Sequence, residues 1–335
     1  MRGRLFTHIV SRETNFIIGE WIFSGESPNI IGNEKLTFLR LQGNNYVIKP
    51  SSFFQAFLCH RTQNGDFLGS DEVRAPIERV TSLAKILAIA NQKGGVGKTT
   101  TSVNLAACLG AKKQRVLLVD SDPQGNASSG FGIQKSELPA TIYDVLLGNA
   151  SAAEATVHTD YKVDVVPANI NLAGAEVELV SAISRETRLK KALDAVRDAY
   201  DYILIDCPPS LGLLTLNALA AADAVLLPIQ CEYYALEGVA QLMNTITLVR
   251  DNLNPDLAVE GVVLTMYDGR TKLAQDVVSE VQKNFGDIVY KTLIPRNVRL
   301  SEAPSYGQPV IYYDKHSKGA KVYQELAKEV LKRGR

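Results

Sequence analysis

Continuous apolar runs alternate with amphipathic stretches from about residue 85 to the end of the chain. The runs do not alternate with polar residues, so they predict strands of a parallel sheet that is covered by helices on both faces. The expected strands are Ile86–Ala90, Arg115–Asp120, Tyr202–Asp206, Ala224–Ile229, Val259–Met266 and the shorter Ile288–Leu293. The expected helices are Thr101–Leu109, Arg188–Ala199, Leu236–Arg250 and Ala274–Phe285. This order predicts an α/β fold with a doubly wound, mostly parallel sheet.

The last amphipathic stretch, residues 318–333, has apolar residues at helical spacing. A helix that lies in a membrane interface carries Trp, Phe or Leu on its apolar face. This stretch has no Phe or Trp, which favours a helix packed on the protein core. No stretch approaches the ~20 apolar residues of a membrane span.

Residues 1–83 follow a different pattern and are expected to form an extension, separate from an α/β domain at residues 84–335. Short strand-like pieces such as Phe16–Ile18 and Tyr46–Ile48 are interrupted by Gly and Asn turn signals. Two amphipathic helices around a tight turn cannot be placed, which argues against a helix-turn-helix. A poorly ordered extension or a small β-rich appendage is favoured. A third hypothesis is that translation begins at Leu83, which the intact mass of the natively expressed protein would test.

Composition and charge limit the possible functions without selecting one. The 335 residues, 46% of them hydrophobic, suffice for one large α/β domain or two smaller ones. Basic and acidic residues number 36 each, so any nucleic-acid contact depends on a local patch. The cysteines have no CxxC spacing and are expected to be buried thiols in a reducing cytosol. They are Cys59, Cys108, Cys207 and Cys231.

A glycine-rich stretch joins the first expected strand to the first expected helix. Its residues are Lys93, Gly94, Gly95, Val96, Gly97, Lys98, Thr99 and Thr100. Strand, glycine loop, Lys-Thr and helix together indicate a P-loop, in which backbone N–H groups and the helix N-terminus hold phosphate. Lys98 is expected at the β- and γ-phosphates, and the Thr99 hydroxyl at Mg²⁺. Lys93 is an additional lysine that an ordinary P-loop does not need.

Two carboxylate motifs follow strands that end at the same edge of the sheet. Asp120 is expected to support Mg²⁺ through water, and Asp122 to orient or deprotonate an attacking water. Asp206 ends an apolar strand in a Walker-B pattern, where a carboxylate holds a water of the Mg²⁺. Asp-Pro and Gly-Asn also form solvated turns, and many strands end in Asp. The nearby P-loop is therefore what gives these motifs their functional meaning.

The stretches Lys93–Thr100, Asp120–Asn126 and Ile203–Ser210 together resemble the motifs of the ParA/Soj family of chromosome-partition ATPases. This family belongs to the deviant Walker A, MinD-like group. The later stretches Leu264–Thr271 and Ile294–Pro304 match as well. The resemblance extends from about residue 85 to the C-terminus and leaves the N-terminal extension unexplained.

The resemblance implies a P-loop NTPase fold and a slow ATPase that uses ATP and Mg²⁺. Lys93 matches the family's signature lysine, which reaches across an ATP-sandwiched homodimer to the partner's phosphates. Such a cation supplied in trans is comparable to an arginine finger. Asp122 matches the residue required for hydrolysis. Pro295 and Asn297 match the segment that contacts adenine, which accounts for a preference for ATP.

The resemblance also implies partners. The family's dimer binds DNA without sequence specificity, and Arg270 and Arg299 match basic positions used for this. Their expected contacts are phosphates, so DNA affinity should fall steeply with salt. Each arginine alternatively serves as an ordinary surface charge or in an intramolecular ion pair. A ParB-like centromere-binding protein is the implied activator, and the expected location is the cytoplasm, on the nucleoid of a chromosome or plasmid.

Other functions remain open from the sequence alone. A MinD-like protein would attach to membranes by its C-terminal helix, and the iron-protein relatives would bridge two subunits with cysteines. Cys207 and Cys231 do not lie in the motif that this bridge requires. A switch that positions another cargo, such as a secretion complex, would use the same ATP site. A neighbouring gene for a ParB-like DNA-binding protein would distinguish these functions.

Overall fold

The computed structural model describes residues 83–232 and 237–334, together with the backbone of six short strands between residues 4 and 48. The chain divides into two units, residues 1–82 and 83–335. In the first unit three antiparallel pairs form: β1 (Arg4–Ser11) with β2 (Thr14–Ile22), β3 (Ile30–Ile31) with β4 (Glu34–Lys35), and β5 (Thr37–Leu41) with β6 (Asn44–Ile48). The two strand-like pieces expected from the sequence lie within β2 and β6. The remaining predictions for this unit, including the burial of Cys59, lie outside the described residues.

The second unit is built on a seven-stranded sheet in the order β13-β12-β7-β11-β8-β10-β9. All neighbouring strands are parallel except β9 and β10, so the predicted fold class is confirmed. The strands are β7 (Lys85–Ile89), β8 (Val116–Asp120), β9 (Val157–His158), β10 (Asp164–Val166), β11 (Tyr202–Asp206), β12 (Ala224–Gln230) and β13 (Ala258–Thr265). Only the two short strands β9 and β10 have no counterpart in the sequence prediction.

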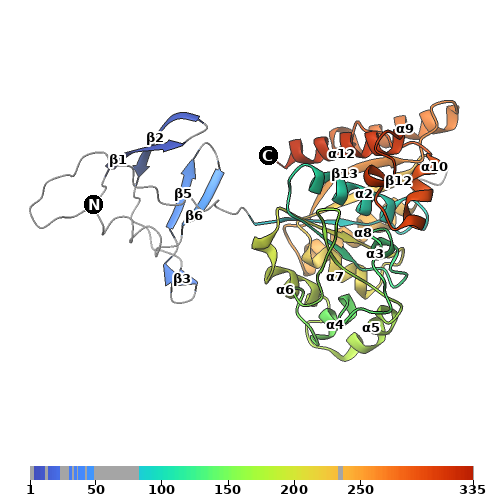
Figure 1. The fold of residues 1–335 in the computed structure, drawn as a ribbon, viewed down its shortest axis with the longest axis horizontal. Coiled ribbons are helices and arrows are strands. Elements are labelled where there is room, and N and C mark those ends of the chain that lie inside the picture. The colour runs from blue at the N-terminus through green and yellow to red at the C-terminus, as the bar shows by residue number, and fades with distance from the viewer. Residues whose placement is uncertain are drawn as a thin grey trace, which may run out of the picture. The chain divides into compact units, whose positions relative to one another are not determined.

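Helices cover both faces of this sheet (Figure 1). They are α2 (Lys98–Ala111), α3 (Asn126–Ser129), α4 (Ile142–Leu147), α5 (Leu172–Glu178), α6 (Arg188–Asp194), α7 (Leu213–Ala221), α8 (Glu237–Asn252), α9 (Lys272–Phe285), α10 (Val298–Glu302), α11 (Val310–Tyr313) and α12 (Lys318–Arg333). Four short 3₁₀ helices are η1 (Leu179–Ser181), η2 (Arg197–Ala199), η3 (Gly286–Ile288) and η4 (Ala303–Tyr306). The helix expected at residues 188–199 is therefore interrupted, because α6 ends at Asp194 and η2 follows.

The core consists of two layers, one on each face of the sheet. In β7, Ile86 and Ala88 pack into the layer that includes α4 to α8, whereas Leu87 and Ile89 pack into the layer that includes α2 and α12. Successive side chains of a strand point to opposite faces, so a strand covered on both sides must be apolar throughout. This is why the apolar runs in the sequence are continuous.

The segment expected as a sixth strand, Ile288–Leu293, is not a strand. It follows the edge of β13 with only two backbone bonds, from Tyr290 N to Val262 O (2.8 Å) and from Ile294 N to Leu264 O (2.8 Å). Between them the chain turns to α12, where Lys291 N donates to a Glu329 carboxylate oxygen (3.0 Å). The strand prediction was wrong because Ile294, and not Thr292, donates to Leu264, so two extra residues interrupt the regular ladder that a strand would continue after Tyr290.

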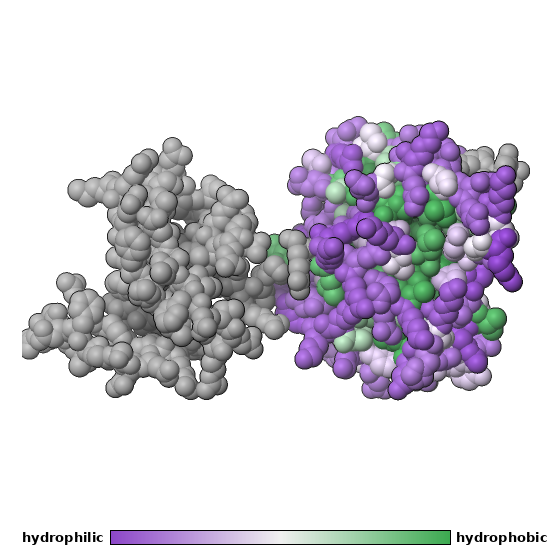
Figure 2. All heavy atoms as spheres, turned by 90° about the horizontal axis from the view of Figure 1, so that it is seen from above, coloured by the Kyte–Doolittle hydropathy of each residue, from purple (hydrophilic) through white to green (hydrophobic). Residues whose placement is uncertain are grey.

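Helix α12 packs on α2, as expected from its apolar spacing. Tyr323, Leu326 and Val330 are buried, and the Tyr323 hydroxyl lies 3.2 Å from the Thr101 hydroxyl of α2. The face of the second unit seen in Figure 2 is mainly hydrophilic, with hydrophobic residues showing between the polar ones. Within the part of the chain that the structure describes, no helix combines the length and apolar character needed to cross a bilayer.

Candidate functional site

The glycine-rich loop lies between β7 and α2, at the carboxyl end of a central strand. Gly95 (φ 74°) and Gly97 (φ 89°) adopt left-handed conformations that other residues rarely take. Gly97 is the N-cap, so α2 begins at Lys98 and not at Thr101, where the apolar pattern begins. The loop therefore leads directly into the positive end of a 14-residue helix. This arrangement suits an anion with several oxygens.

The two lysines of the loop have different surroundings. Lys98 is only 7% exposed, and its ammonium donates to the Lys93 carbonyl oxygen (3.1 Å). Burial lowers the pKa of Lys98, although the nearby carboxylates of Asp206 and Asp122 act in the opposite direction. The Lys93 ammonium has no hydrogen-bond or ion-pair partner among the described residues. Its charge is thus available to a group outside this chain.

Two polar side chains fix the loop and were not singled out by the sequence analysis. Asn91 receives a bond from Lys93 N (2.9 Å) and donates to the Pro228 carbonyl of β12 (2.7 Å). The Thr265 hydroxyl at the end of β13 donates to the Val96 carbonyl (2.7 Å). Only the three-dimensional fold brings these residues together, because Thr265 lies 169 positions from Val96.

Asp206, at the end of β11, meets the first turn of α2. Its two carboxylate oxygens accept from the Thr99 hydroxyl (2.8 Å) and the Ser102 hydroxyl (2.7 Å). The side chain is fully buried, and burial raises its pKa, with a further increase from the charge of Asp120. Thr99 and Asp206, which were each expected at Mg²⁺, thus lie in direct contact. Ser102 was missed, although it lies one helical turn after Lys98 and therefore on the same face of α2.

Asp120 is the residue opposite Asp206 in the paired strands β8 and β11. It is also fully buried, and one carboxylate oxygen accepts from both Ser128 N (2.8 Å) and the Ser128 hydroxyl (2.7 Å). Burial raises the pKa of Asp120, while the bonds from Ser128 oppose the shift. Ser128, in α3, was not predicted. It ties α3 and the segment after β10 to Asp120, since Ala168 N also donates to its hydroxyl (3.0 Å).

Asp122 lies in the turn after β8 and is half-buried. One carboxylate oxygen accepts from Gln124 N (2.9 Å), and the Asp122 N–H donates to Asp120 (3.2 Å). Between the two carboxylates, the buried Ser121 hydroxyl has no hydrogen-bond partner in the described part of the chain. The Ser121 hydroxyl can therefore still form a hydrogen bond beside the loop, which suits a polar ligand.

The segment at residues 294–297 lies beside the residues that follow β13. Tyr267 N donates to the Ile294 carbonyl (2.9 Å), and Tyr267 pairs with the buried Pro295 in an isolated parallel bridge. Asn297 caps α10, because its side-chain oxygen accepts from Arg299 N (3.1 Å). The two residues expected at adenine therefore lie next to the strand end that holds the glycine loop.

Both arginines expected at DNA are exposed and form ion pairs within the chain. Arg270 is 90% exposed and binds the Asp268 carboxylate through two nitrogens (2.9 and 2.7 Å). Arg299 pairs with Glu302 (2.7 Å) and lies 3.4 Å from Asp314. Hydrogen bonds to Asp268 and Glu302 raise the pKa of the Arg270 and Arg299 guanidinium groups, respectively. Of the two uses expected from the sequence, the intramolecular ion pair is therefore present in this structure.

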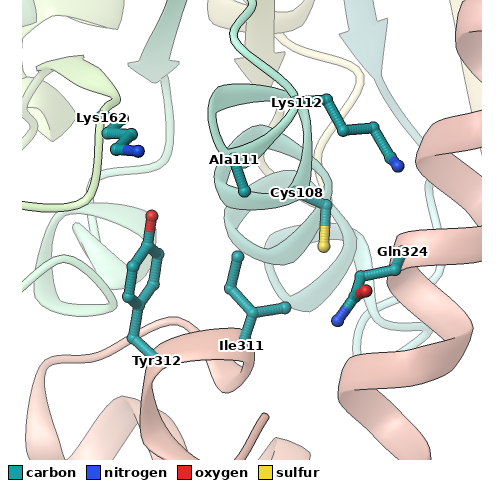
Figure 3. A pocket seen from close by; sticks show the side chains of 7 residues that line it. All are labelled: Cys108, Ala111, Lys112, Lys162, Ile311, Tyr312 and Gln324. Carbon is teal, nitrogen blue, oxygen red and sulfur yellow. The ribbon is translucent and has the colours of Figure 1, made fainter.

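A separate hollow of about 360 Å³ lies at the opposite end of α2 from the loop (Figure 3). It is lined by Cys108, Ala111, Lys112, Lys162, Ile311, Tyr312 and Gln324. Lys112 caps the carbonyl end of α2, where a positive charge is favourable without any ligand. The Cys108 thiol is buried, which raises its pKa to about 12 and keeps it protonated. Cys207 and Cys231 are buried too, so the prediction that these three cysteines are buried thiols is confirmed.

Residues 84–259 match a family model described as an AAA domain. The chain is 62% identical over 253 residues to the sporulation initiation inhibitor protein Soj of Bacillus subtilis, covering 75% of this chain and 100% of that protein. It is 56% identical to the chromosome partitioning protein ParA of Myxococcus xanthus, over 75% of this chain and 89% of that protein.

Solved structures show the same fold. Cobyrinic acid a,c-diamide synthase from Mycobacterium smegmatis, crystallised with a bound ATP analog and magnesium, is 42% identical with a TM-score of 0.67. That match covers 76% of this chain and 98% of the other. The cell division ATPase MinD of Pyrococcus furiosus is 28% identical with a TM-score of 0.61, over 75% and 99% of the two chains. By its sequence relatives and its fold, this chain belongs to the ParA/Soj family of chromosome-partitioning ATPases.

Proposed function

We propose that this protein is an ATP-dependent dimerising switch that binds DNA without sequence specificity and drives chromosome or plasmid partitioning. A ParB-like partner stimulates its ATP hydrolysis, and the protein acts in the cytoplasm on the nucleoid. The observation that carries the proposal is the joint placement of Lys98, Thr99 and Asp206 beside a loop whose other lysine, Lys93, has no described partner. The ATPase domain of this proposal spans residues 84–335.

The residues of the loop fit ATP with Mg²⁺. Thr99 and Asp206 supply oxygen donors, and the described residues contain no group of three or more His, Cys, Asp or Glu side chains that could hold a metal by themselves. This donor set suits Mg²⁺, which keeps several waters and uses one or two carboxylates and the nucleotide phosphates. Thr99 would hold the ion directly, with Asp206 and Asp120 acting through water. When bound, Mg²⁺ neutralises charge on the β- and γ-phosphates.

The side chains then divide the work of hydrolysis. Lys98 gives up the Lys93 carbonyl and places its charge against the β- and γ-phosphates. Asp122 accepts a hydrogen bond from the attacking water through its free carboxylate oxygen, which orients that water. Lys93 extends to the phosphates held by a second copy, so that full stabilisation of the developing charge requires a dimer. A cation supplied in this way contributes about 10³–10⁵ in rate.

In this proposal the exposed arginines make the nonspecific contacts with DNA. Arg270 and Arg299 exchange their carboxylate partners for DNA phosphates, a step that costs little because surface ion pairs are weak. Dimerisation doubles the number of such contacts and so links DNA binding to ATP. Because α12 uses its apolar side chains for packing on α2, the membrane attachment of a MinD-like protein is not favoured for this helix.

The test measures ATP-dependent retention on nonspecific DNA and the ATPase rate, with and without the product of the adjacent gene. The proposal expects DNA retention only with ATP and faster hydrolysis with a ParB-like product. The variant Lys93→Ala should bind ATP as a monomer and lose both responses. ATP-independent DNA retention, or a wild-type protein that stays monomeric with ATP, would contradict the switch.

A further inference from the structure

Thr265, the last residue of β13, is buried beneath the glycine-rich loop. Only 2% of its surface is exposed, and its hydroxyl donates to the Val96 carbonyl over 2.7 Å. The Val96 side chain is itself buried, and a Cβ built on Gly97 would lie 3.7 Å from the Thr265 methyl group. Thr265 therefore supports the middle of the loop from below, by a hydrogen bond and by packing.

This hydrogen bond has a consequence for the next N–H group. In a trans peptide the C=O and the following N–H point in opposite directions. With the Val96 carbonyl held toward Thr265, the Gly97 N–H is directed away from β13, and it has no acceptor among the described residues. Gly97 is also the N-cap of α2, so this N–H joins the positive helix terminus that suits an anion.

The same strand end also supports the segment expected at adenine. The Thr265 carbonyl accepts from Cys231 N (3.0 Å), and two residues later Tyr267 N donates to the Ile294 carbonyl (2.9 Å). Between them Met266 has a φ of 52°, a left-handed conformation that is uncommon for a residue other than glycine. A change at Thr265 can therefore act on the phosphates or on the base, and the experiment must separate the two.

We infer that Thr265 is a positioning residue for nucleotide binding, which acts through the Val96–Gly97 peptide to direct the Gly97 N–H at the phosphates. The inference rests on the proposed function, because it requires that the loop binds a nucleotide. Thr265 itself does not touch the ligand. Its hydroxyl holds the carbonyl on the far side of the peptide, so that the loop is already in its binding conformation before the ligand arrives.

The experiment compares Thr265→Val, which keeps the shape and loses the hydroxyl, with Thr265→Ser, which keeps the hydroxyl. Two ligands compete with a fluorescent ATP analogue: ATP, and tripolyphosphate, which has no base. In Thr265→Val the free loop can turn the Val96 carbonyl toward water, and binding must bury it again without a donor, which should weaken ATP binding by about tenfold. Thr265→Val should show this loss for both ligands by the same factor, and Thr265→Ser should bind both nearly as the wild type does.

Each other result overturns the inference. If Thr265→Val binds ATP as the wild type does, or if Thr265→Ser loses as much affinity, the hydroxyl does not position the loop. A loss for ATP but not for tripolyphosphate would place the effect at the base. The melting temperature without nucleotide is measured for each variant, and if Thr265→Val does not fold, Thr265→Ser and Thr265→Ala give the same comparison. Failure of the wild type to bind ATP would instead refute the proposed function.

Discussion

Two groups of charged side chains share the carboxyl edge of the sheet, and they are built in opposite ways. Asp120 and Asp206 are fully buried, and hydroxyl or N–H donors occupy their oxygens. Arg270 and Arg299 are exposed and form ion pairs with carboxylates that lie near them in the fold. Buried partners fix a geometry, as an in-line reaction needs. An exposed arginine can exchange its carboxylate partner for another anion, as contact with the phosphates of a nucleic acid would require.

Lys98→Ala should have the largest effect, because it removes the one buried ammonium of the loop. We expect no detectable ATP binding in equilibrium titrations, since the charge-assisted bonds to phosphate can no longer form. Lys112→Ala, at the other end of α2, is the matched control and should bind ATP normally. Retained tight binding by Lys98→Ala would refute the P-loop interpretation, and the buried group would then have no assigned function.

Asp122→Ala should separate binding from hydrolysis. Without a group that orients or deprotonates water, the ATPase rate should be lower by about 10²–10⁴-fold, while ATP binding persists. Size-exclusion chromatography with light scattering should then find a long-lived dimer with ATP. Asp160→Ala, at an exposed position outside the loop, is the control. An Asp122→Ala variant that stays monomeric with ATP would mean that the role assigned to this carboxylate is wrong.

Arg270→Glu should weaken DNA retention without changing ATP affinity. The slope of log affinity against log salt should fall by about one for each phosphate that the variant no longer binds. Asp268→Asn tests the exchangeable pair from the other side, because it frees Arg270 and should strengthen retention. Arg115→Glu is the control, since Arg115 forms a similar pair with Asp201 (2.8 Å) at the amino end of β8. Equal retention of all variants over several salt concentrations would count against the patch.

Arg299→Ala should have the smallest effect on stability. Its ion pairs are solvent-exposed, and such pairs contribute little to folding. Differential scanning fluorimetry should find the same melting temperature as for the wild type. Ser128→Ala, which removes a donor from the buried Asp120, should instead melt at a clearly lower temperature. Equal melting temperatures for the two variants would remove the energetic difference between the two groups.

The sequence predicts the central strands well because a strand that is buried on both faces must be apolar throughout. It predicts edges less well: β9 has two residues and β10 has three, too few for a pattern. The segment at 288–293 looks like a strand locally, but it leaves the ladder after Tyr290, where Lys291 N donates to Glu329 of α12. The predicted start of helix α2, at Thr101, is three residues late, because the residues of the phosphate motif that begin the helix are not apolar.

For the site, the motif residues could be predicted from local strings, whereas their supports could not. Lys98, Thr99 and Asp206 belong to motifs whose chemistry is legible in the sequence, and the fold brings them together. Ser128 and Thr265 are hydroxyl residues, and nothing in the sequence around them marks them as part of the site. They acquire their importance from contacts with Asp120 and Val96 that only the folded chain creates.

The diverted segment beside β13 also bears on how two copies can associate. An open sheet edge is a template on which another chain can add a strand, a common route to aggregation. Here one edge strand, β13, has part of its length occupied by the backbone of Tyr290 and Ile294, and the other edge ends in the two-residue β9. Neither edge offers a long free ladder. Sheet continuation between copies is thereby discouraged, so it would not compete with the proposed ATP-controlled contact between two copies.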